Sequence, residues 1–253
     1  MDLEIKERNG FKYIDEGEGE VLLLLHGLFG ALSNWEHVTE HFSKKYRVVI
    51  PMLPLYTLPL KDAGLKGLNK FVEKFVKEFG FEKVNIVGNS LGGHVGLIYT
   101  LKNQEKVNRL ILTGSSGLYE NTMGTSFPKR GDYQFVKEKT EYTFYDPKVA
   151  TKELIDEVYE TTKDNGKCIR IVYLARSAQK NNLRDDLKDI KVKTCLIWGS
   201  NDTITPPEVA HEFNEKIPDT ELHFIDKCCH APMMEHPKTF NTLLEDFLER
   251  TKN

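Results

Sequence analysis

The chain has 253 residues, 40% of them hydrophobic and 29% charged, which suffices for one large domain, or a domain with an inserted subdomain, around a sizeable core. Its formal net charge of −3 argues against nucleic acid as a partner, and its longest apolar run is far too short to span a membrane. The chain starts without an apolar signal-peptide core and its four cysteines show no disulfide or metal-ligand spacing, so we expect a cytoplasmic protein with reduced thiols and no membrane contact.

Short apolar strands alternate with amphipathic helices through the first half of the chain. Asn9-Gly10 favours the positive φ angles of a tight turn, so the residues on either side predict a hairpin. The continuous apolar run of residues 21–25 is typical of a central strand covered on both faces. Further strands are expected at residues 48–50, 84–87 and 109–113, and helices around Trp35 to Phe42, at 65–79 and at 91–102. This alternation predicts an α/β fold with a mainly parallel sheet and helices on both faces.

The pattern changes in the middle of the chain. Between residues 118 and 189 no buried strand is expected, and helices are predicted at 132–142, 151–163 and 167–180. Strands resume at 194–198 and 221–225, and a last helix begins near Pro237. We therefore predict a core domain made of residues 1–117 and 190–253, with residues 118–189 inserted as a helical cap.

One stretch carries the strongest sign of chemistry, Gly88-Asn89-Ser90-Leu91-Gly92. It lies between a predicted strand and a predicted helix and matches the G-x-S-x-G pattern of a nucleophile elbow, in which a strained turn presents the serine hydroxyl. Glycines flank the serine because a Cβ would clash in so tight a turn. The helix N-terminus after Ser90 favours a developing negative charge.

A serine needs a base, and the base needs a carboxylate that orients it. Asp202 follows the strand that ends near Trp198, and His230 follows the strand that ends at Ile225. The order Ser90, Asp202, His230 is the order of the α/β-hydrolase arrangement, so we predict these three as catalytic residues. Asp226 also follows a strand and is the rival acid, although only four residues separate it from His230.

With these motifs in place, the sequence resembles the α/β-hydrolase family throughout, apart from the inserted segment. Four stretches carry the resemblance: residues 26–30, 88–93, 198–202 and 230–237. The resemblance implies a cap over the active site, no cofactor, and a monomer or homodimer acting on a small-molecule substrate. It also implies an oxyanion hole formed by the backbone N–H groups of Leu91 and Leu28, with Phe29 as the alternative to Leu28.

Two positions depart from the family's pattern. Many relatives have Asp-x-Pro-Gly-x-Gly where this chain has residues 52–56, Met-Leu-Pro-Leu-Tyr, and we expect that bulkier loop to narrow the entrance. Relatives usually have glycine before the histidine, where this chain has Cys229. Neither change removes a catalytic group.

These features predict a serine hydrolase that cleaves a small carboxylic ester through an acyl-enzyme. The alternative is a carbon–carbon bond hydrolase, because Gly-Asn-Ser resembles the elbow of the meta-cleavage-product hydrolases; a weakly catalytic small-ligand receptor on the same fold is a further alternative. The candidate substrate-binding residues are Phe29, Asn89, Lys129, Arg130 and Trp198. Lys129 or Arg130 would suit a substrate carboxylate.

A metal site is the remaining alternative. Residues 37–41 match the H-x-x-E-H pattern of inverted zinc proteases, but no third ligand is evident, so we interpret them as the solvated face of a helix and predict no metal. His94, one turn after Ser90, is interpreted as a packed helix residue.

Overall fold

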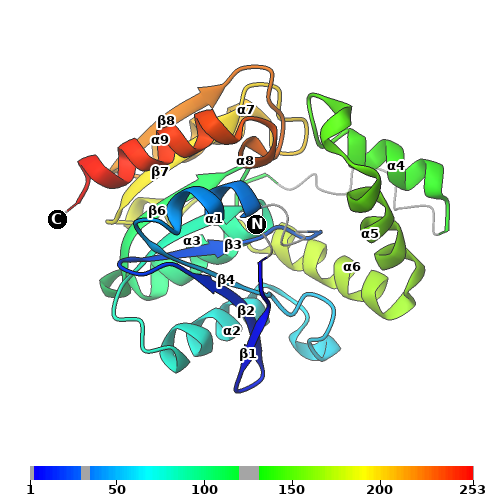
Figure 1. Ribbon diagram of the computed structural model, residues 1–253, viewed down its shortest axis with the longest axis horizontal. Helices are drawn as coiled ribbons and strands as arrows, with labels where there is room; N and C mark the ends of the chain where they lie inside the picture. Colours follow the sequence, from blue (N-terminus) through cyan, green and yellow to red (C-terminus); the bar gives the residue numbers. More distant parts are fainter. Residues whose placement is uncertain (1–2, 30–34, 120–130, 253) are drawn as a thin grey trace.

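The computed structural model describes residues 3–29, 35–119 and 131–252. Within them an eight-stranded sheet has the order β1-β2-β4-β3-β5-β6-β7-β8 (Figure 1). Its strands are β1 (Lys6–Arg8), β2 (Phe11–Glu16), β3 (Val21–Leu25), β4 (Arg47–Pro51), β5 (Val84–Asn89), β6 (Val107–Thr113), β7 (Lys193–Gly199) and β8 (Thr220–Ile225). β2 is antiparallel to β1 and β4, and every pair from β4 to β8 is parallel. The predicted α/β fold with a mainly parallel sheet is confirmed.

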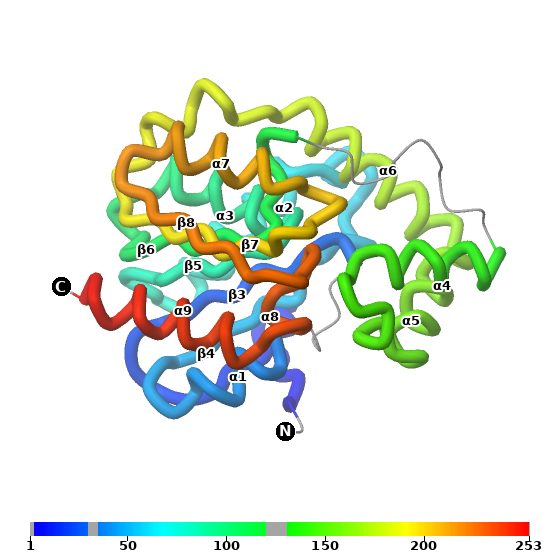
Figure 2. The backbone as a smooth tube through the Cα atoms, turned by 90° about the horizontal axis from the view of Figure 1, so that it is seen from above, coloured from blue at the N-terminus to red at the C-terminus, as the bar shows by residue number. Residues whose placement is uncertain are grey.

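Helices cover both faces of the sheet. The α-helices of the described residues are α1 (Glu36–Phe42), α2 (Leu65–Glu78), α3 (Leu91–Lys102), α4 (Tyr133–Glu141), α5 (Lys152–Lys163), α6 (Asn165–Lys180), α7 (Pro207–Lys216), α8 (Pro232–Glu235) and α9 (Pro237–Arg250). Because strand side chains alternate between faces, Leu23 and Leu25 pack with α2, α3 and α7, while Leu22 and Leu24 pack with α1 and α9. The result is a three-layer arrangement with the sheet in the middle (Figures 1 and 2).

The first turn forms as the sequence predicts. β1 and β2 pair with Arg8 opposite Phe11, and the two residues between them, Asn9 and Gly10, have φ angles of 49° and 80°. Positive φ at both central positions gives the backbone twist that matches a hairpin.

In the described part of the segment between β6 and β7, the helices α4, α5 and α6 lie beside the sheet (Figure 1). α6 contacts the core where the backbone N–H of Leu65 donates to Ser177 Oγ at 3.0 Å and Arg170 Nε donates to the carbonyl of Leu58 at 2.8 Å. The division into a core and a cap at residues 118 and 189 stays a prediction.

The sequence analysis did not predict α7 or the four-residue α8. α7 begins at Pro207, directly after Pro206. Proline is well accommodated at the first position of a helix because its missing N–H has no partner there in any case. Val209, Ala210 and Phe213 bury the inner side of α7 against the sheet, which stabilises the helix.

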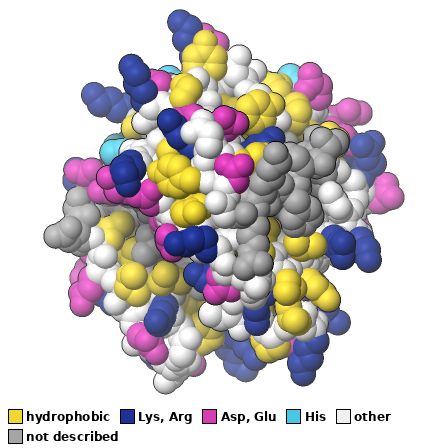
Figure 3. All heavy atoms as spheres, turned by 90° about the vertical axis from the view of Figure 1, so that its right-hand side faces the viewer, with side chains coloured by type: hydrophobic (Ala, Val, Ile, Leu, Met, Phe, Trp, Pro, Cys, Tyr) yellow, Lys and Arg dark blue, Asp and Glu magenta, His cyan; other side chains and the backbone are white. Residues whose placement is uncertain are grey.

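The described surface mixes charges of both signs. On the face shown in Figure 3, basic and acidic side chains are interspersed with hydrophobic ones over the part of the chain that is coloured. Among residues 3–29, 35–119 and 131–252, no helix is long and apolar enough to cross a membrane.

The crossing of α3 over β3 makes a specific stability prediction. A Cβ on Gly92 would lie 2.1 Å from the carbonyl oxygen of Leu25, and backbone cannot move aside as a side chain can. We expect Gly92→Ala to lower the free energy of unfolding by about 3 kcal/mol or more, measured by urea denaturation. Gly10→Ala is the control, because its Cβ would meet nothing within 4 Å and only its positive φ costs stability, about 1 kcal/mol. Equal losses in the two variants would contradict the close crossing.

Candidate active site

Ser90 lies in the turn between β5 and α3 and has a backbone conformation that few serines adopt. Its φ is 53° and its ψ is −120°. The strained residue is held from both sides, since its N–H donates to the carbonyl of Thr113 at 3.2 Å and its own carbonyl accepts the N–H of Ser116 at 3.1 Å. A Cβ on Gly88 would lie 2.5 Å from Gly93 Cα, so the turn closes only with glycine there. These contacts form the elbow that the sequence predicts.

Asp202 is a buried carboxylate whose two oxygens are occupied. Oδ1 accepts the backbone N–H groups of Ile204 at 2.8 Å and Thr205 at 3.0 Å, and Oδ2 accepts the Thr205 hydroxyl at 2.9 Å. His230 Nδ1 lies 2.9 Å from Oδ2, and because a carboxylate only accepts, the ring nitrogen donates. This fixes the tautomer of His230 and leaves Nε2 as the acceptor that a general base requires.

Thr205 is a site residue that the sequence analysis missed. Its hydroxyl binds Asp202, and its carbonyl accepts the indole N–H of Trp198 at 2.8 Å. A hydroxyl three residues after an aspartate is the one sequence signal that could have indicated it. Trp198 supports the acid loop through this hydrogen bond. Its side chain is fully buried and has no surface open to a ligand. Its expected contact with substrate stays a prediction.

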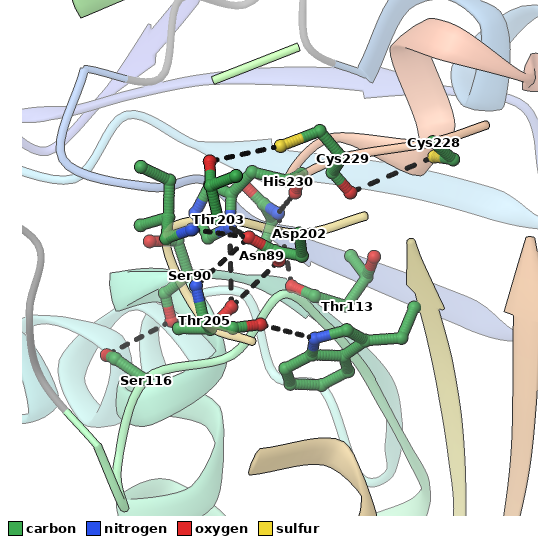
Figure 4. A network of polar contacts seen from close by, with 12 residues as sticks. Asn89, Ser90, Thr113, Ser116, Asp202, Thr203, Thr205, Cys228, Cys229 and His230 are labelled. Atoms are coloured by element: carbon green, nitrogen blue, oxygen red, sulfur yellow. Dashed lines mark hydrogen bonds and ion pairs between the residues drawn. The ribbon is translucent and has the colours of Figure 1, made fainter. Parts of the chain in front are cut away.

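His230 is fixed through its backbone as well as its ring. Its N–H donates to the carbonyl of Thr143 at 3.2 Å, and its carbonyl accepts Asn89 Nδ2 at 3.1 Å. The same Asn89 nitrogen donates to the carbonyl of Thr113 at 3.1 Å. Figure 4 shows Ser90, Asp202 and His230 in one network of polar contacts. Asn89, expected to bind substrate, is buried and uses its amide to join the elbow strand to the histidine loop.

The rival acid is placed elsewhere. Asp226 is exposed, and its Oδ1 accepts the hydroxyl of Ser200 at 3.4 Å. It therefore lies at the surface of the loop, whereas Asp202 occupies the buried position next to His230.

The His-Gly loop after β3 is held by the residues that depart from the family pattern. Leu53 N–H donates to His26 Nε2 at 3.1 Å, and the Tyr56 hydroxyl donates to the carbonyl of Leu28 at 2.9 Å. Burial lowers the pKa of His26, in keeping with a neutral ring that accepts at Nε2. Residues 52–56 thus brace this loop, and their expected narrowing of the entrance stays a prediction.

The two expected oxyanion donors come from neighbouring strand ends. Leu28 and Phe29 are half-buried in the loop after β3, and Leu91 is the first residue of α3. The first N–H groups of a helix have no acceptor within that helix, so Leu91 N–H is available to an anion beside Ser90. A Cβ on Gly27 would lie 3.2 Å from Ser90 Cβ, which places the His-Gly loop directly against the elbow.

Two expected substrate-binding residues, Lys129 and Arg130, lie outside the described residues. His94 is fully buried, and its Nε2 lies 2.9 Å from the carbonyl of Asn181. It packs in α3 as the sequence predicts.

The H-x-x-E-H pattern lies on the outer side of α1. His37 and Glu40 are exposed, and His41 Nε2 lies 3.1 Å from Glu245 on α9. A second group with metal-ligating atoms is formed in the described residues by Cys195, Glu221 and His223. There both Glu221 carboxylate oxygens accept hydrogen bonds from Arg250, at 3.0 and 3.2 Å. The positive charge of the Arg250 guanidinium would repel a metal cation bound at that position.

A family model described as alpha/beta hydrolase fold matches residues 20–147 and 145–237, and so spans the elbow, the acid and the histidine. The chain belongs to the α/β-hydrolase family. It is therefore a hydrolase of the α/β fold.

Relatives of this hydrolase match along almost their whole length. It is 28% identical to a 2-hydroxy-6-oxononadienedioate/2-hydroxy-6-oxononatrienedioate hydrolase of Comamonas testosteroni, over 92% of this chain and 89% of the relative. It is 30% identical to a 2-hydroxy-6-oxo-6-(2'-aminophenyl)hexa-2,4-dienoic acid hydrolase of Metapseudomonas resinovorans, over 94% and 87%. A solved structure, MGS-MChE2, an alpha/beta hydrolase enzyme from a sediment metagenome of the Mar Chica lagoon in Morocco, is 39% identical with a TM-score of 0.82, over 99% of this chain and 100% of that one.

The Thr205 hydroxyl makes a prediction about this hydrolase. Thr205→Val removes a donor from the buried Asp202 carboxylate and leaves the side-chain volume nearly unchanged. We expect the free energy of unfolding to fall by about 1–2 kcal/mol and kcat to fall about tenfold, because Asp202, the partner of His230, is then held less firmly. Thr205→Ser keeps the hydroxyl and should stay within about twofold of wild type, less than about 0.5 kcal/mol in the barrier. Equal losses in both variants would assign the effect to packing.

Proposed function

We propose that this hydrolase uses Ser90 as the nucleophile, His230 as the general base and acid, and Asp202 as the carboxylate that orients His230. The observation that carries the proposal is the buried Asp202–His230 pair, 2.9 Å apart, beside a serine held at a φ of 53°. A strained backbone is retained where function requires it. The backbone N–H groups of Leu28 or Phe29 and of Leu91 would bind the oxyanion, and the chemistry needs no metal or cofactor.

We propose a carbon–carbon bond as the bond that is cleaved. Relatives that match more than nine-tenths of this chain are named for the hydrolysis of 2-hydroxy-6-oxo-dienoates. The Gly-Asn-Ser elbow also favours this class over the ester that the sequence analysis placed first. Such a substrate carries a ketone at C6 for the serine to attack and a conjugated 2-hydroxy acid that can accept the electrons of the broken bond.

The steps balance as a hydrolysis. With the dienol in its 2-oxo form, Ser90 Oγ adds to the C6 carbonyl while His230 Nε2 takes the hydroxyl proton. The C5–C6 bond then breaks, its electron pair moves through the C3–C4 double bond to the 2-oxo oxygen, and a proton is delivered to that oxygen, which gives a 2-hydroxydienoate. Water, deprotonated by His230, releases the acyl group from Ser90 as a carboxylic acid.

An ester is the second candidate. Its alkoxide or phenoxide leaves without any conjugated system, so the same three residues and the same oxyanion donors suffice. The half-buried, apolar side chains of Leu28 and Phe29 beside the elbow suit the acyl group of a small ester.

The two candidates are separated by comparing substrates on one enzyme preparation. We expect kcat/KM for 2-hydroxy-6-oxo-6-phenylhexa-2,4-dienoate, followed by the loss of dienol absorbance, to exceed that for p-nitrophenyl acetate and butyrate by about tenfold or more, about 1.4 kcal/mol in the barrier. Ser90→Ala should lower every activity by about 10³-fold or more and abolish labelling by a fluorophosphonate. Ser200→Ala, in the acid loop, is the control that should keep both.

The opposite outcomes are informative. A preference for the p-nitrophenyl esters would establish the second candidate. Labelling of Ser90 without turnover of any of these substrates would favour a small-ligand receptor. A wild-type protein that a fluorophosphonate leaves unlabelled would contradict the assignment of Ser90 as the nucleophile.

A further inference from the structure

Residues 142–146, which follow α4, touch both loops that carry the catalytic acid and histidine. We name them the α4 exit segment. The Thr203 hydroxyl, one residue after Asp202, donates to the carbonyl of Tyr142 at 3.2 Å. The His230 N–H donates to the carbonyl of Thr143 at 3.2 Å. The inserted helices are thus connected to the active site by direct hydrogen bonds to its loops.

One side chain, that of Glu235, accepts hydrogen bonds from both the histidine loop and the α4 exit segment. Glu235, at the end of α8, accepts the N–H of Cys229 with Oε1 at 2.7 Å. Its Oε2 accepts the N–H of Tyr145 at 2.6 Å and lies 3.4 Å from the N–H of Asp146. Burial raises the pKa of Glu235, and the three N–H groups act in the opposite direction by favouring the charged form.

Only a carboxylate satisfies this arrangement. Its two oxygens accept from opposite sides and carry no hydrogen that would oppose an N–H group. A glutamine of the same shape could accept from Cys229 or from Tyr145, but its NH₂ group would then face the remaining N–H donor. The bridge therefore depends on the charge of Glu235, and its size alone is not enough.

Cys229 directly precedes His230, so the bond to its N–H fixes the backbone that orients the imidazole. The His230 carbonyl is already held by Asn89 and its N–H by Thr143. The Glu235 carboxylate thus fixes the backbone of the histidine loop. The same carboxylate fixes the α4 exit segment, to which that loop is bound.

We propose that Glu235 is a positioning residue that couples the α4 exit segment to the histidine loop, so that the placement of the inserted helices determines the alignment of His230 with Ser90. The proposal rests on the proposed function in so far as His230 is the base for Ser90. It assigns a role to a residue outside the triad and the oxyanion hole.

The test compares Glu235→Gln with Glu245→Gln. Glu245 on α9 is also partly exposed and pairs with Lys45 and His41, on the outer side of α1. We expect Glu235→Gln to slow fluorophosphonate labelling of Ser90 about tenfold and to lower kcat on the best substrate by a similar factor, with KM within about twofold. Glu245→Gln should change none of these by more than about twofold.

Hydrogen exchange measured by mass spectrometry tests the coupling itself. In Glu235→Gln, peptides that contain Cys229 and peptides that contain Tyr145 and Asp146 should both lose protection, while peptides from β5 keep it. Wild-type protection in both sets of peptides, or a labelling rate equal to that of wild type, would overturn the proposal. If Glu235→Gln fails to fold, Glu235→Asp, whose shorter side chain reaches only one side, should show the same slow labelling.

The labelling assay separates this inference from the proposed function. A wild-type protein that a fluorophosphonate does not label would refute the role of Ser90 and with it the basis of the coupling. A wild-type protein that is labelled, together with a Glu235→Gln variant labelled as fast, would refute the coupling and leave the triad in place.

Discussion

The close approach of β3, β5 and α3 is the constraint on which the site depends. The elbow can form only because glycine backbones let α3 pass close to the ends of β3 and β5. A Cβ on Gly92 would lie 2.1 Å from the carbonyl oxygen of Leu25, and a Cβ on Gly88 would lie 2.5 Å from the Cα of Gly93. That contact places Ser90 at the carboxyl edge of the sheet and brings Gly27 beside it. Parallel strands end at the same edge, so the loops after β7 and β8 bring Asp202 and His230 there as well.

Hydrogen bonds to backbone atoms then hold what the sheet has brought together. The Asp202 carboxylate accepts two backbone N–H groups and one hydroxyl, so its burial next to His230 is compensated. Asn89 joins the carbonyl of Thr113 to that of His230. The acid loop is therefore held by its own backbone, and the loop that carries His230 is fixed by Asn89 from β5.

The inserted helices are attached to this site at one short junction. The α4 exit segment binds the acid loop, the histidine loop and Glu235 within five residues, 142–146. Helices attached in this way can influence the geometry of the site, because the hydrogen bonds at the junction end on the backbone of His230 and of its neighbour Cys229. In α/β hydrolases whose cores are alike, such junctions offer a route by which an inserted segment could affect turnover.

The sequence by itself determined the sheet, the glycine-flanked turn at Ser90 and the placement of Asp202 and His230 directly after strands, because apolar runs, glycine spacing and the position of a residue after a strand are local signals. Tertiary structure decided the rest. Asn89 and Trp198 suggested substrate contact in the sequence, yet their polar atoms bind His230 and Thr205, residues 141 and 7 positions away. Tyr56 and Glu235 bind Leu28 and Tyr145, 28 and 90 positions away, so no local signal indicated those contacts. Thr205 gave only a weak local signal, a hydroxyl three residues after Asp202. Hydrogen bonds between distant segments exist only once the chain has folded, and for that reason no pattern along the sequence could reveal them.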